Sequence, residues 1–89
     1  MKDLELKYPK LFEMVKEENV RQIIKWGIQD HDPFEWLAYT IEELGELSNS
    51  ISEWRYRTGP RSDIVKEAIQ TATLSLKIAE MFIDLQEDI

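Results

Sequence analysis

The chain has 89 residues, of which 18 are acidic and 11 are basic, so its net charge is −7 at pH 7. This length predicts a single domain, residues 1–89, and the acidic balance argues against nucleic acid or an anionic membrane as a partner, because both need a positive face. The chain contains no cysteine and one histidine, which excludes disulfides, thiolate metal sites and multi-histidine metal sites.

The N-terminal residues Met1–Glu5 do not have the pattern of a signal peptide, and the apolar runs are too short to span a membrane. We therefore expect a cytoplasmic protein. Its hydrophobic content of 43% predicts a folded chain rather than a disordered one.

The positions of proline and glycine predict three helices and no strand. The first helix should begin near Pro9 and end before Gly27, since proline is favoured at the start of a helix and glycine at its end. The segment Asp32-Pro33-Phe34-Glu35 has the spacing of a capping box and predicts a second helix start.

The second helix should continue to about Arg57, because Thr58-Gly59-Pro60 breaks it, and the third should start near Ser62 and run nearly to the C-terminus. Two long helices joined by a short turn predict an antiparallel hairpin. The expected fold is therefore an all-α helical bundle built around this hairpin.

The third predicted helix is apolar on two sides. One stripe comprises Val65, Ala68, Ile69, Ala72, Leu76, Ala79 and Ile83, and an opposite stripe comprises Ile64, Thr71, Leu74, Ile78, Met81 and Leu85. A narrow arc with Lys66, Thr73, Lys77, Glu80 and Asp84 is left for water. A helix that is apolar on two sides is buried on two sides, so we expect a homo-oligomer, a dimer or a tetramer, to complete the fold.

Two acidic pairs stand out on the hairpin. Glu43 and Glu46 lie one turn apart at the edge of the apolar arc of the second helix, formed by Leu37, Thr40, Ile41, Leu44, Leu47, Ile51 and Trp54. Glu67 falls inside an apolar stripe of the third helix, with Gln70 one turn on, and a carboxylate there needs a partner. Facing each other, the pairs would form an all-oxygen site that suits Mg²⁺ or Mn²⁺.

These residues resemble a known family. Glu42-Glu43-Leu44-Gly45-Glu46 matches the Glu-Glu-x-x-Glu motif of the MazG-like, all-α nucleoside triphosphate pyrophosphohydrolases, and Glu67-Ala68-Ile69-Gln70 stands where that family has Glu-x-x-Asp. Lys25-Trp26-Gly27 and Trp36-Leu37 resemble segments upstream of the motif. The similarity covers residues 21–83 and departs from the family at Gln70, an amide in place of a carboxylate.

The resemblance implies Mg²⁺-dependent hydrolysis of a nucleoside triphosphate to the monophosphate and pyrophosphate, a house-cleaning activity on non-standard nucleotides, in a dimer or tetramer. Glu43, Glu46, Glu67 and Gln70 would hold the metal, Glu42 and Glu43 would be catalytic, and Glu42 would be a supporting carboxylate that orients the attacking water. An acidic protein that binds a polyanion also needs positive side chains, for which Arg21 and Lys25 are candidates; Arg55, Arg57 and Arg61 are others. A base could stack on Trp26 or Trp36.

Other interpretations stay open at this stage. The acidic residues could form a solvated helix face, and Glu67 could belong to a buried ion pair with Lys25 or with an arginine of another subunit. The tryptophans could serve core packing, and His31 could be structural. The alternative function is a non-catalytic oligomeric helical module with a degenerate metal site; pyrophosphohydrolysis of a phosphoribosyl-nucleotide is another.

Overall fold

The computed structural model describes residues 4–83, which form three helices and no strand. Helix α1 spans Pro9–Trp26, α2 spans Pro33–Arg57 and α3 spans Arg61–Ile83. The three predicted helices are confirmed, and each starts within one residue of its predicted position. The predicted continuation of the third helix through Asp84 and Leu85 lies outside the described residues.

Local capping interactions fix the ends of the first two helices. Gly27 has a positive φ of 76°, and its N–H donates to the Ile23 carbonyl at 2.7 Å, which ends α1. The Asp32 carboxylate accepts from the Glu35 N–H at 2.9 Å, and the Glu35 carboxylate accepts from the Asp32 N–H at 3.2 Å. The predicted capping box at the start of α2 is therefore confirmed.

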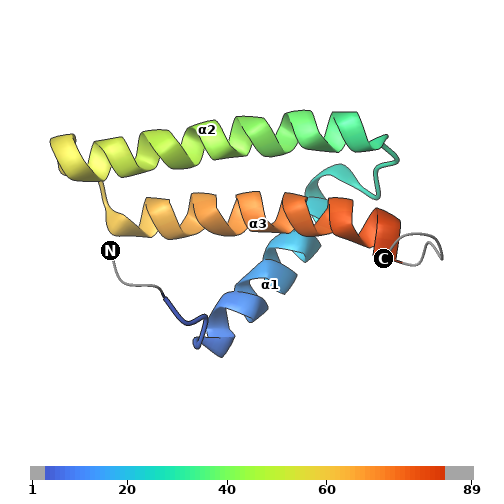
Figure 1. The fold of residues 1–89 in the computed structure, drawn as a ribbon, viewed down its shortest axis with the longest axis horizontal. Coiled ribbons are helices and arrows are strands. Elements are labelled where there is room, and N and C mark those ends of the chain that lie inside the picture. Colours follow the sequence, from blue (N-terminus) through green and yellow to red (C-terminus); the bar gives the residue numbers. More distant parts are fainter. Residues whose placement is uncertain (1–3, 84–89) are drawn as a thin grey trace.

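Helices α2 and α3 lie side by side and run antiparallel, joined by a turn at residues 58–60, and α1 crosses α3 obliquely (Figure 1). In the described part of the chain, α1 packs on α3 and not on α2. Helix α3 is therefore the central element, with α2 on one side and α1 on another. No helix within residues 4–83 is long and apolar enough to cross a membrane.

The core is small and is centred on α3, on which both α1 and α2 pack. Its most buried side chains are Gln22, Ile69, Thr73 and Leu74. Thr73, which was predicted to face water, is 1% exposed, so that prediction is wrong. Its hydroxyl donates to the Ile69 carbonyl at 2.8 Å, and this bond makes burial possible because it satisfies the polar group within its own helix.

Candidate metal and nucleotide site

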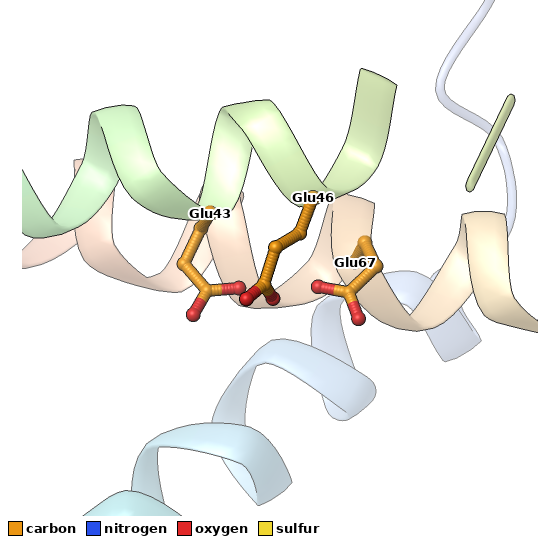
Figure 2. Close-up of side chains that lie close together, drawn as sticks. All are labelled: Glu43, Glu46 and Glu67. Atoms are coloured by element: carbon orange, nitrogen blue, oxygen red, sulfur yellow. The ribbon is translucent and has the colours of Figure 1, made fainter. Parts of the chain in front are cut away.

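Three carboxylates converge where α2 faces α3. Glu43 and Glu46 project from successive turns of α2 toward Glu67 on α3, and Figure 2 shows all three carboxylates pointing into one space. One ligand oxygen from each residue lies within 4.8 Å of the others. The structure thus brings together the three carboxylates predicted to hold a metal, and we call this group the acidic cluster.

Among residues 4–83, no lysine, arginine or histidine side chain forms an ion pair with the acidic cluster, so the alternative in which Glu67 pairs with Lys25 is not found. Burial, and after it the nearby charges of Glu46 and Glu67, together raise the pKa of Glu43 from 4.5 to about 7. A cation that enters the cluster would offset the repulsion among these carboxylates and stabilise the ionised form of Glu43.

Gln70 lies beside the acidic cluster, and its partners assign the orientation of its amide. The amide nitrogen donates to Glu67 Oε2 at 2.9 Å and to Glu43 Oε2 at 3.0 Å. The amide oxygen accepts from Arg21 Nη2 at 3.1 Å. In this arrangement Gln70 gives the carboxylates hydrogen bonds and turns its own oxygen toward α1.

Arg21, predicted to bind substrate, belongs to a polar network on α1. Its Nε and Nη2 atoms donate to the Glu18 carboxylate at 2.9 and 2.8 Å, and this hydrogen-bonded pairing raises the pKa of Arg21 above its ordinary value. Glu18 also accepts from Gln22 Nε2 at 2.8 Å, and Gln22 Oε1 accepts from Lys77 Nζ at 2.6 Å. A continuous hydrogen-bonded chain therefore links Lys77, through α1, to Gln70 and the acidic cluster.

A cavity of about 610 Å³ opens next to the acidic cluster. Its lining includes Glu42 and Glu43 from α2, Gln70 and Lys77 from α3, and Arg21 and Trp26 from α1. The segment between α1 and α2 also lines it, with Ile28, Gln29, Asp30 and His31. This volume lies within the range of about 300–1,000 Å³ that small-molecule sites occupy.

Aromatic rings gather at the end of the cavity formed by the start of α2. His31 packs edge-on against Trp36 and Tyr39, with ring centroids 4.9 and 5.2 Å apart. The amine of Lys77 lies 5.3 Å from the Trp36 ring centroid, and burial lowers the pKa of Lys77. His31 is therefore part of an aromatic group lining the cavity rather than a solvated residue.

Of the other residues predicted to act on substrate, some line the cavity and some do not. Trp26 lines the cavity, and Glu42 lies on its rim, exposed. Lys25 lies over the Trp26 ring at 4.6 Å and, in the described part of the chain, does not line the cavity. Arg55, Arg57 and Arg61 lie at the hairpin turn away from it, where Arg57 donates to Glu53.

Sequence reasoning missed the roles of Glu18, Gln22 and Lys77. Lys77 was assigned to the water-facing arc of the third helix, yet it is half-buried against α1 and Trp36. The contact that reveals its role joins residues 55 positions apart, and no local pattern specifies it.

The donor set fits a hard divalent cation. Three carboxylates could supply oxygen ligands, and the described residues offer neither thiolate nor a second imidazole, a set that would suit Mg²⁺ or Mn²⁺ better than softer metals. Comparisons of the chain with protein-family models, with curated proteins and with solved structures gave no match in any of the three.

Proposed function

We propose that the protein is a Mg²⁺-dependent nucleoside triphosphate pyrophosphohydrolase, which cleaves its substrate to the monophosphate and pyrophosphate. The observation that carries this proposal is the convergence of Glu43, Glu46 and Glu67 within 4.8 Å beside a nucleotide-sized cavity. The resemblance of Glu42-Glu43-Leu44-Gly45-Glu46 to the Glu-Glu-x-x-Glu motif of MazG-like enzymes supports the same reaction.

The acidic cluster would hold the cation through the carboxylates of Glu43, Glu46 and Glu67. When bound, such an ion neutralises phosphate charge and lowers the pKa of a coordinated water. Glu42, exposed on the cavity rim, is the carboxylate free to accept a proton from the attacking water.

The cavity offers the remaining contacts for a nucleotide. Arg21 and Lys77 place positive charge on its wall, which favours a polyanion in a protein whose net charge is −7. Trp26 and Trp36 also line the cavity, and a base would stack on one of these rings. Phosphates at the acidic cluster and a base near the aromatic rings would fill the cavity along its length.

We also propose that the chain works as a homo-oligomer, a dimer or tetramer. Large apolar side chains of α2 lie open to solvent, among them Ile41 at 59% and Leu44 at 52% exposure. Side chains of α1 and α3, such as Ile24 and Leu76, are exposed as well. Exposed apolar side chains of this size are typical of interaction surfaces, and packing of identical chains across a symmetry axis would cover them.

The alternative function is a non-catalytic helical module with a degenerate metal site. The orientation of Gln70 favours it, because the amide oxygen is engaged by Arg21 and so the cluster has three oxygen ligands rather than four.

Product analysis separates these functions. The protein is incubated with ribo- and deoxyribonucleoside triphosphates and a phosphoribosyl-nucleotide, with Mg²⁺ or with EDTA. We expect Mg²⁺-dependent formation of the monophosphate and pyrophosphate from a triphosphate. A diphosphate and phosphate would contradict the proposed bond cleavage, and no hydrolysis of any substrate would favour the non-catalytic module.

A further inference from the structure

The amide of Gln70 lies between hydrogen-bond acceptors on one side and a hydrogen-bond donor on the other. Two carboxylates, Glu67 and Glu43, accept from its nitrogen at 2.9 and 3.0 Å, and the Arg21 guanidinium donates to its oxygen at 3.1 Å. A guanidinium carries donors only, and an ionised carboxylate accepts only. Only one of the two amide orientations therefore places the amide N–H groups toward the carboxylates and the amide oxygen toward the guanidinium.

Arg21 is itself fixed from the side of α1. The nearly buried carboxylate of Glu18 accepts from its Nε and Nη2, and Gln22 braces that carboxylate from the next turn. A two-point pairing of arginine with a carboxylate restricts the guanidinium plane. The orientation of Gln70 on α3 is therefore set by α1, a helix that does not pack on α2.

We propose that Arg21 locks Gln70 as a hydrogen-bond donor to Glu67 and Glu43, so that Gln70 positions the ion-binding carboxylates and is not itself a ligand of the ion. This inference rests on the proposed function, since it assigns roles around the same cation. It replaces the metal-ligand role predicted for Gln70 with that of a positioning residue, and it gives Arg21, whose charge lies on the cavity wall, the further role of supporting Gln70.

The orientation that its partners assign to the amide opposes coordination by the Gln70 oxygen. Turning that oxygen toward the cluster would break two hydrogen bonds to charged acceptors and set the amide N–H groups against the Arg21 donors. Each carboxylate has about four lone-pair sites, so one bond from Gln70 leaves the others free for an ion. The donor role and ion binding by the glutamates are compatible.

A double-mutant cycle on Mn²⁺ binding tests the proposal. Dissociation constants are measured for the full chain, Arg21→Met, Gln70→Met and the double variant. Arg21 also repels the ion through its charge, but this repulsion is the same in the protein with Gln70 and in Gln70→Met. The quantity compared is the factor by which Arg21→Met raises the Mn²⁺ dissociation constant. We expect this factor to be about threefold or more larger when Gln70 is present than when it is replaced in Gln70→Met. A smaller difference between the two factors would overturn the proposal.

Lys66→Met is the matched control, because Lys66 precedes Glu67 and is an exposed cation outside the network. It should show no such coupling to Gln70→Met. The same titration of the unmodified chain and of Glu43→Gln separates the two proposals. Absence of Mn²⁺ binding would overturn the proposed function and this inference with it, whereas binding without coupling would overturn this inference alone.

A second readout follows the Gln70 side-chain amide protons by NMR, identified by their loss in Gln70→Met. In the ion-free protein they should exchange slowly with water, and Arg21→Met should speed their exchange where Lys66→Met does not. On addition of Mg²⁺ they should stay protected. Release of these protons to solvent on Mg²⁺ binding would mean that the oxygen has turned to the ion, which contradicts the proposal.

Discussion

The amine of Lys77 donates to the amide oxygen of Gln22 at 2.6 Å, and this bond joins α3 to α1 at the floor of the cavity. Gln22 is 7% exposed, and its nitrogen donates in turn to Glu18, so both ends of the amide are satisfied. Lys77 also lies over the Trp36 ring of α2. One side chain thus contacts both neighbours of the central helix.

Replacing one partner of this bond should destabilise the fold. Lys77→Met conserves shape but leaves the buried Gln22 oxygen without its donor, which we expect to lower the free energy of unfolding by about 1–3 kcal/mol. Urea unfolding followed by circular dichroism measures the change. The double variant Lys77→Met/Gln22→Leu should recover part of the loss, and additive losses would contradict a direct interaction between the two side chains.

Much of the secondary structure is predictable because its signals are local. The capping box at Asp32 and Glu35, Pro9 at the start of α1 and Gly27 at its end each act within one helical turn. The juxtaposition of Glu43 with Glu67 also follows from sequence, since a short turn places the two helices antiparallel. These features depend on spacing alone.

The placement of α1 is not predictable in this way. Thr73 was assigned to water because it is polar, yet its hydroxyl bonds within its own helix and α1 covers that side of α3. The choice of which side α1 covers depends on long-range contacts such as Lys77 with Gln22. The network that orients Gln70 was missed for the same reason.

Replacing Glu67 by leucine should separate function from folding. An apolar side chain suits the half-buried position between α2 and α3, and it removes repulsion from Glu43 and Glu46, so the ion-free protein should gain about 1 kcal/mol in unfolding free energy. Pyrophosphate release should be abolished. Thermal unfolding in EDTA and the release assay measure the two effects. Loss of folding would instead assign Glu67 a structural role.

Mg²⁺ should stabilise the unmodified protein and not Glu67→Leu. At ten times the dissociation constant, binding to the folded state adds about 1.4 kcal/mol to the unfolding free energy. Glu53→Gln is a charge-matched control on α2, since Glu53 pairs with Arg57 outside the acidic cluster. Stabilisation of Glu67→Leu equal to that of Glu53→Gln would contradict the assignment of the ion to this cluster.

The ion-free protein should lose stability as the pH rises. The pKa of Glu43 is about 7 in the folded state against an ordinary value of 4.5, so the folded state binds this proton more tightly than the unfolded state. The favourable contribution is complete below pH 4.5 and disappears as the pH rises through 7. Urea unfolding in EDTA at pH 5.5 and pH 8 measures the fall, which Glu43→Gln should reduce. An equal pH dependence in both proteins would contradict this role of Glu43.

The cap at the start of α2 should contribute measurably to stability. Asp32→Ala removes the acceptor of the Glu35 N–H, and we expect a loss of about 1 kcal/mol in unfolding free energy. Asp32→Asn keeps an acceptor oxygen and serves as the matched control in the same unfolding experiment. A loss as large in Asp32→Asn as in Asp32→Ala would show that the charge, and not the capping bond, matters there.

The most direct test of the proposed function is the Mg²⁺-dependent release of pyrophosphate from nucleoside triphosphates by the unmodified chain, Glu43→Gln and Glu53→Gln. Glu43→Gln removes one carboxylate charge from the acidic cluster, and Glu53→Gln removes one from the same helix outside it. We predict release by the unmodified chain and by Glu53→Gln, and none by Glu43→Gln or in EDTA. Equal release by both variants, or release that persists in EDTA, would contradict a catalytic cation held by Glu43, Glu46 and Glu67.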